Sequence, residues 1–72
     1  QTKKNILLNQ QPMEAKDIVI NDDVWLGTGV KVLSGVKINK GAIVAAGSVV
    51  KNNIPEYEIH GGIPAKKIGI RE

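Results

Sequence analysis

The sequence contains no cysteine, no phenylalanine, one tryptophan, one tyrosine and one histidine among its 72 residues. Without cysteine, neither a disulfide framework nor a thiolate zinc site is available, and a lone histidine argues against a structural zinc site. A chain of this length buries only roughly 60% of the surface that its unfolded form exposes, so the fold is marginal by itself. We therefore expect association between subunits to supply the missing stability.

Long hydrophobic runs are also missing. No apolar run approaches the roughly 18 residues that a membrane span requires, and the first residues do not form a signal-peptide pattern. The hydrophobic content of 42% and charged content of 24% are typical of a globular protein. Together with the lack of cysteine, these features predict a cytoplasmic protein with no membrane span.

The charge is slightly positive, with 10 Lys and Arg residues against 7 Asp and Glu residues. The basic residues are dispersed along the chain, whereas a nucleic-acid-binding protein usually gathers them on one helix or arm. Few aromatic side chains are available to stack on bases. We expect no nucleic-acid partner, and interpret the lysines as solvated surface residues of which two or three could contact a phosphate-bearing small ligand.

A repeat of six residues runs through the middle of the sequence. One ladder consists entirely of Ile, Leu and Val: Ile20, Leu26, Val32, Ile38, Val44 and Val50. A second ladder comprises Val24, Val30, Val36, Ala42, Ser48 and Ile54, and a third comprises Gly29, Gly35, Gly41 and Gly47. Three ladders with one period indicate a structural repeat rather than chance.

The period of six selects strands over helices. It is a multiple of two, so each ladder stays on one face of an extended segment, but it is not a multiple of 3.6. Glycine at each bend tolerates a positive φ. The sequence therefore predicts an all-β parallel solenoid whose stacked coils place like side chains over one another.

Composition divides the chain into three segments. Residues 1–17 are predicted to form a loop or excursion, residues 18–54 the repeat, and residues 55–72 a carboxyl-terminal tail with short strands at Tyr57–His60 and Lys67–Ile70. The ends of a solenoid expose strand edges and require a cap, which either flanking segment could provide.

The segment Ile20–Val30, with its Asp-Val-Trp motif, resembles the signature coil of the hexapeptide-repeat acyltransferases. Val36–Val50 continues the resemblance, and Gly62–Ile68, with Pro-Ala-Lys, resembles the carboxyl-terminal segment of that family. The sugar and antibiotic O-acetyltransferases are the branch with the greatest similarity. The resemblance implies a left-handed parallel β-helix of about two coils, with irregular segments at both ends.

The resemblance also implies a function. The family forms homotrimers, binds acetyl-CoA in a groove between adjacent subunits, and acetylates small molecules. We therefore expect this chain to be the carboxyl-terminal part of an acetyl-CoA-dependent O-acetyltransferase acting on a sugar or hydroxylated small molecule. The alternative is a non-catalytic solenoid assembly module, or a truncated relative.

Several residues match family positions around the cofactor and acceptor. Trp25 corresponds to a position that borders the acceptor site, although a corner tryptophan could serve packing alone. The turn at Gly27 and Thr28 would bind the pantetheine arm or thioester through its N–H groups, or else reflect turn chemistry. If a coil has eighteen residues, Ala45 and Ala46 stack near that turn and leave room for the cofactor.

Lysines that match the family's carboxyl-terminal pattern are candidates for the cofactor's phosphates. Lys66, in the Pro-Ala-Lys motif, is the clearest match, while Lys51 is displaced by one position and Lys67 follows directly. Lysine suits this role because its compact charge meets a phosphate without fixed geometry. Solvated surface lysine is the competing interpretation for each of the three.

No catalytic residue is assigned within these 72 residues. The resemblance implies a base histidine upstream of the Asp-Val-Trp motif, at or just before Gln1, where this sequence has none. His60 is far from that position and is interpreted as an exposed or capping residue. The adjacent Asp22 and Asp23 point to opposite faces of an extended chain, so we interpret them as turn residues and not as a catalytic pair.

Overall fold

The computed structural model describes residues 4–6 and 16–72, which contain strands and turns and no helix. The strands in chain order are β1 (Lys4–Ile6), β2 (Ile18–Ile20), β3 (Trp25–Leu26), β4 (Lys31–Val32), β5 (Lys37–Ile38), β6 (Ile43–Val44), β7 (Val49–Val50), β8 (Glu58–Gly62) and β9 (Ala65–Ile70). In this part of the chain, therefore, no helix is long and apolar enough to cross a membrane. The all-β class is confirmed.

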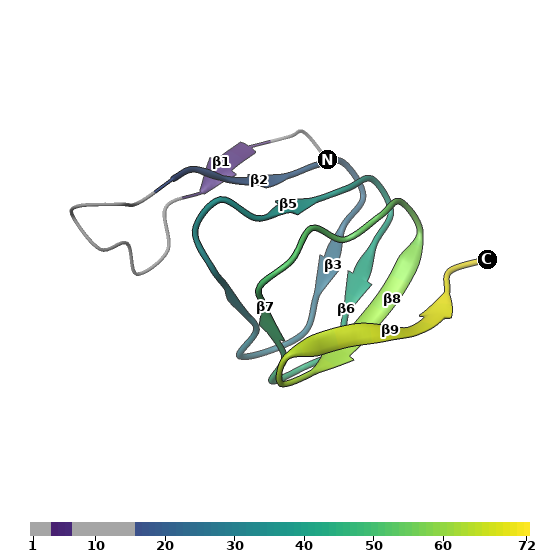
Figure 1. Cartoon of the computed structure of the whole chain (residues 1–72). Helices are drawn as coiled ribbons and strands as arrows, with labels where there is room; N and C mark the ends of the chain where they lie inside the picture. The colour runs from purple at the N-terminus through teal and green to yellow at the C-terminus, as the bar shows by residue number, and fades with distance from the viewer. Residues whose placement is uncertain (1–3, 7–15) are drawn as a thin grey trace.

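The strands wind into a left-handed parallel β-helix (Figure 1). Its three sides are the sheets β1-β2-β5, β3-β6-β8-β9 and β4-β7. Parallel pairing places Ile20 beside Ile38, Trp25 beside Ile43 and Lys31 beside Val49. Each of these pairs is separated by eighteen residues, so three hexads complete one coil as expected.

The glycine ladder forms the corners of the coils. Gly29, Gly35, Gly41 and Gly47 have φ values of 74°, 81°, 73° and 74°, respectively. A side chain is disfavoured in this region of backbone space, which explains why glycine recurs at the bends. The bend that follows β3 is closed across the coils as well, because Gly47 N–H donates to Thr28 O at 2.9 Å.

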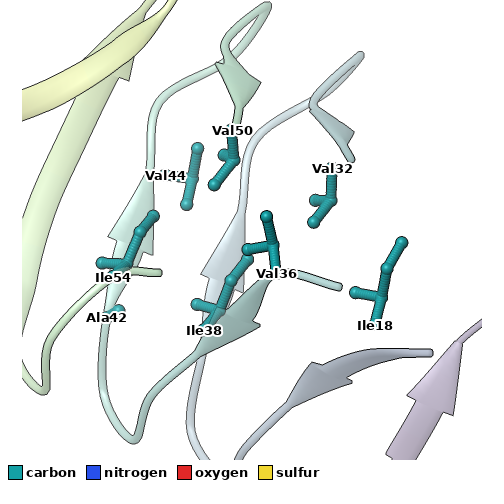
Figure 2. Close-up of a cluster of buried hydrophobic side chains, with 8 residues drawn as sticks. All are labelled: Ile18, Val32, Val36, Ile38, Ala42, Val44, Val50 and Ile54. Atoms are coloured by element: carbon teal, nitrogen blue, oxygen red, sulfur yellow. The ribbon is translucent and has the colours of Figure 1, made fainter. Parts of the chain in front are cut away.

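The interior is a column of branched aliphatic side chains (Figure 2). Its buried members are Ile18, Val32, Val36, Ile38, Ala42, Val44, Val50 and Ile54. Two members of the first ladder are less buried, since Ile20 is intermediate and Leu26 is 40% exposed. Leu26 lies on β3, the terminal strand of its sheet, and among the described residues no strand pairs with its free side.

The third coil departs from the eighteen-residue spacing. Ile54 bridges to Ile38, and Ile59 pairs with Ile43, so both offsets are sixteen residues. In the shortened turn, a side-chain oxygen takes the place of a backbone carbonyl as hydrogen-bond acceptor: Asn53 Oδ1 accepts from Lys37 N–H at 2.8 Å. Asn39 Nδ2 donates to Ile54 O at 2.8 Å and fixes the new register.

The carboxyl-terminal segment contains an antiparallel hairpin of β8 and β9, and both strands are longer than the short strands predicted there. A buried hydroxyl attaches this hairpin to the coil beneath. Ser48 is 0% exposed; its Oγ donates to Ala45 O at 2.7 Å and accepts from Gly62 N–H at 3.0 Å. Ser48 therefore satisfies its own buried hydroxyl while anchoring the hairpin.

At the amino-terminal side, β1 pairs antiparallel with β2. The remainder of the excursion predicted for residues 1–17 falls mainly on residues 1–3 and 7–15, which lie outside the described part of the chain. The domain boundaries at residues 18 and 54 stay a prediction.

Candidate functional site

Trp25 projects from the outer surface of the β-helix. Its neighbour Leu26 pairs with Val44, whose side chain lies in the interior, and alternation along the strand directs Trp25 outward. The indole is 63% exposed, while the backbone is fixed by a 3.0 Å hydrogen bond from Trp25 N–H to Ala42 O. Packing among residues 4–6 and 16–72 therefore does not account for a tryptophan at this position.

Small residues stack at one corner of successive coils, after β3, after β6 and at the end of β8. We call this the small-residue corner and define it as residues 27–29, 45–47 and 61–62. Gly27 N–H donates to Val44 O at 2.8 Å, and Ala45 N–H donates to His60 O at 2.9 Å. The predicted stacking of Gly27 and Thr28 with Ala45 and Ala46 is thus confirmed.

Gly27 has no side chain because the next coil leaves no room for one. A Cβ at Gly27 would lie 2.5 Å from Ala46 N and 2.7 Å from Ala46 Cα, both rigid backbone atoms. A Cβ at Gly61 would likewise lie 3.1 Å from Ala45 Cβ. Close packing of the coils explains these two glycines, and the surface that results has few side chains.

The three candidate lysines lie in different surroundings. Lys66 is exposed and pairs with Gly61, so it stands beside the small-residue corner. Lys67 pairs with His60 on the adjacent position, and its Nζ lies 3.5 Å from Glu58 Oε2. Lys51 is exposed at the following corner, after β7. The structure brings only Lys66 of the three directly to the small-residue corner.

His60 and Glu58 form a polar pair at the carboxyl-terminal end of the interior. His60 pairs with Val44, whose side chain is buried, and its own side chain is 13% exposed. Its Nε2 lies 2.9 Å from Glu58 Oε1, and this hydrogen bond, followed by the charge of Lys67, lowers the pKa of Glu58 below its ordinary value. His60 therefore lies over the core as a capping residue that is engaged with a carboxylate.

Glu58 and His60 share one face of β8 because they are two residues apart on one strand, whereas Lys67 reaches them through the antiparallel pairing of β8 with β9, a contact that the sequence did not predict. The Gly61-Gly62 and Pro64 turn signals could have indicated the hairpin. Asp22 and Asp23 lie in the turn between β2 and β3, as expected. Among residues 4–6 and 16–72, no three His, Asp or Glu side chains are grouped so that they could hold a metal ion.

The profile of the family described as bacterial transferase hexapeptide (six repeats) matches residues 17–52. The chain belongs to this family. It is 44% identical over 64 residues to WbbJ of Escherichia coli (strain K12), which is named as a lipopolysaccharide biosynthesis O-acetyl transferase. The match covers 89% of this chain and 33% of that protein. The chain thus spans about a third of the length of the curated relatives it matches.

Solved structures agree with the family. The hexapeptide-repeat-containing acetyltransferase VCA0836 from Vibrio cholerae superposes with a TM-score of 0.79 and 37% identity, over 99% of this chain and 43% of that chain. Serine acetyltransferase from Brucella abortus, solved in complex with coenzyme A, gives a TM-score of 0.77 and 32% identity, over 79% of this chain and 23% of that one.

Proposed function

We propose that the protein is part of an O-acetyltransferase that transfers the acetyl group of acetyl-CoA to a hydroxyl of a sugar or another small molecule. The observation that carries the proposal is the small-residue corner beside the exposed indole of Trp25, in a chain of the hexapeptide transferase family. The alcohol oxygen attacks the thioester carbonyl, coenzyme A leaves as its thiol, and the alcohol proton passes to a base.

The corner suits an extended acyl carrier. Acyl transfer requires N–H donors near the developing oxyanion and an aligned donor group. Gly27 N–H and Ala45 N–H already donate to Val44 O and His60 O, so these residues contribute low side-chain obstruction, and we place the N–H donors at Thr28 and Ala46. Lys66 is exposed beside them and offers a positive charge for a phosphate. Trp25 forms the neighbouring apolar wall against which we place the acceptor and the thioester end.

Lys67 and Lys51 have less support as phosphate ligands. Lys67 is near Glu58, which compensates its charge, and Lys51 projects from another corner. His60 is hydrogen-bonded to Glu58 over the interior, so we do not assign it as the base. The base is expected from the segment that the family places before the Asp-Val-Trp motif.

Subunit association is part of the same proposal. The described surface exposes several large apolar side chains: Trp25, Leu33, Ile63, Ile68 and Ile70. Because hexapeptide-repeat transferases are typically trimeric, we propose a homotrimer in which neighbouring subunits cover some of these side chains and close the cofactor groove. Because acetyl-CoA is a cytoplasmic metabolite, the proposal also places the protein in the cytoplasm. Light scattering at several protein concentrations measures the oligomeric mass directly.

The test is release of coenzyme A thiol from acetyl-CoA, with a panel of sugars and hydroxylated compounds as acceptors. It is applied both to this chain and to the product of the whole reading frame that encodes it. These 72 residues contain no cysteine, so they add no protein thiol to the coenzyme A signal. Lys66→Ala is expected to raise KM for acetyl-CoA but not for acetyl-pantetheine, which lacks the nucleotide phosphates, whereas the matched Lys67→Ala variant leaves both unchanged.

Two results would contradict the proposal. One is a protein that neither binds acetyl-CoA at millimolar concentration nor transfers its acetyl group to any acceptor, which would favour a non-catalytic assembly module. The other is an equal loss of acetyl-CoA affinity in Lys66→Ala and Lys67→Ala. Lys66 would then have no specific role, and the small-residue corner would not be the acetyl-CoA site.

A further inference from the structure

Arg71 joins turns from successive coils at the corner that precedes β3. Its Nη1 donates to Asp23 O at 2.9 Å and to Gly41 O at 3.1 Å, and it lies 3.6 Å from Asp23 Oδ2. Its backbone N–H donates to Tyr57 O at 2.7 Å. One residue at the end of β9 therefore holds backbone from three levels of the β-helix.

The turns held by Arg71 have unfavourable backbone conformations. Asp23 and Tyr57, with φ of 63° and 60°, are the non-glycine residues with positive φ in the described part of the chain, and both lie at this corner. Gly41, with φ of 73°, lies so close beneath Tyr57 that a Cβ would overlap the ring. Such conformations persist only where surrounding contacts enforce them. Backbone hydrogen bonds from Gly41 N–H to Asp22 O and from Tyr57 N–H to Lys40 O supply part of these contacts, and Arg71 supplies the side-chain part.

Strand β3 begins at Trp25, two residues after Asp23 of this corner. The Trp25 indole is 63% exposed, so neighbouring side chains do little to orient it, and β3 has only two residues. The direction of the indole therefore depends on the backbone, which is held by the bond from Trp25 N–H to Ala42 O and by the turn that leads into β3. Arg71 binds the carbonyls of Asp23 and Gly41, and the next residue after Gly41 provides the carbonyl that receives Trp25 N–H.

We infer that Arg71 is a positioning residue, which fixes the turn before β3 and thereby the direction in which Trp25 faces the acceptor. The kinetic part of this inference rests on the proposed function. Arg71 does not join Lys66 in binding phosphate, since its guanidinium is directed to Asp23 and Gly41 at a different corner from the small-residue corner. Its effect on the reaction is exerted through Trp25.

The experiment compares Arg71→Gln, Arg71→Lys and the control Lys40→Gln, which removes one positive charge from an exposed side chain of the same corner. Trp25 is the single tryptophan of the sequence, so acrylamide quenching of its fluorescence reports on this site alone. At a temperature where all variants are folded, Arg71→Gln is expected to alter the quenching constant. Its kcat/KM for the acceptor falls roughly tenfold, while KM for acetyl-CoA, whose phosphates we place at Lys66 on another corner, changes less.

Arg71→Lys is expected to give intermediate values, because lysine keeps the charge but cannot hold both carbonyls with one planar group. A purely structural role would lower the unfolding temperature of Arg71→Gln without altering quenching or kcat/KM for the acceptor in the folded protein. That result, or identical behaviour of Arg71→Gln and Lys40→Gln, would overturn the inference. If Arg71→Gln does not fold, wild-type quenching and kinetics in Arg71→Lys would overturn it.

The two proposals fail in different ways. A wild-type protein that transfers no acetyl group contradicts the proposed function, while the quenching comparison still decides whether Arg71 holds Trp25. An active wild-type enzyme whose kcat/KM for the acceptor and Trp25 quenching are insensitive to Arg71→Gln contradicts the positioning role alone.

Discussion

Replacing Gly27 with alanine tests the contact between coils directly. Gly27 and Gly29 occupy the same turn, but Gly27 is restricted by crowding and Gly29 by its backbone conformation. A Cβ at Gly27 would lie 2.5 Å from Ala46 N and 3.0 Å from Ala45 C. Gly29 has a positive φ of 74° and nothing within 4 Å of its Cβ position. The pair therefore separates the cost of crowding from the cost of backbone conformation.

The expected magnitudes differ. Alanine at position 27 must push the coils apart by roughly 1 Å, since ordinary Cβ contacts begin near 3.4 Å. This separation strains the 2.8 Å bond from Gly27 N to Val44 O and the 2.9 Å bond from Gly47 N to Thr28 O. Overpacking of about 1–3 kcal/mol, plus a weakened hydrogen bond worth about 1 kcal/mol, gives a loss of about 2–4 kcal/mol.

Gly29→Ala is expected to cost only about 1 kcal/mol. The penalty of about 1–2 kcal/mol for alanine in a left-handed conformation is partly offset by the lower entropy of the unfolded chain. Urea denaturation followed by circular dichroism gives both free energies of unfolding. For a chain of this size the total stability is roughly 4–11 kcal/mol, so both losses are measurable. Equal destabilisation, or a larger loss for Gly29→Ala, would refute the close stacking at Gly27.

Three further substitutions test the interior and the cap. Ile38→Ala removes a side chain with 0% exposure and is expected to cost about 2–5 kcal/mol in urea denaturation; a loss below about 1 kcal/mol would contradict its place in the interior. Ser48→Ala leaves Gly62 N–H without its 3.0 Å acceptor and should cost about 1–3 kcal/mol, with faster amide exchange at Gly62; unchanged exchange would argue against the anchor. The lowered pKa of Glu58 means that its carboxylate stabilises the fold above its ordinary pKa and that this contribution is lost as the pH falls through the folded-state pKa. Unfolding temperatures measured between neutral and acidic pH should therefore fall more in the wild type than in Glu58→Gln, and parallel curves would contradict the pairing.

The regular part of the fold could be predicted from sequence because it is local and repeated. Spacing of the Ile20 ladder predicts which residues face the interior, and the Gly29 ladder predicts the corners with positive φ. Eighteen-residue stacking follows once three sides are assumed, and it places Ala46 against Gly27. The left hand of the helix came from the family resemblance and not from the repeat.

The contacts of the carboxyl-terminal segment could not be predicted in the same way. The third coil shifts to a sixteen-residue offset where Asn53 replaces a backbone acceptor, and no periodic signal marks that change. Arg71 reaches Asp23 across 48 positions of sequence, so its partner depends on the assembled corner. The contact of Lys67 with Glu58 likewise needs the assembled hairpin, whereas Glu58 and His60 already share a face of one strand.

The most direct test of the account is an acetyl-CoA titration of the isotopically labelled protein followed by backbone NMR. We predict saturable shifts of the amides along the small-residue corner and beside it, at Gly27, Thr28, Ala45, Ala46 and Lys66, together with the Trp25 indole. The corner that contains Asn21 and Asn39 should not respond. Shifts confined to that other corner, or no shifts at millimolar acetyl-CoA, would contradict the assignment of the small-residue corner as the acyl-CoA site.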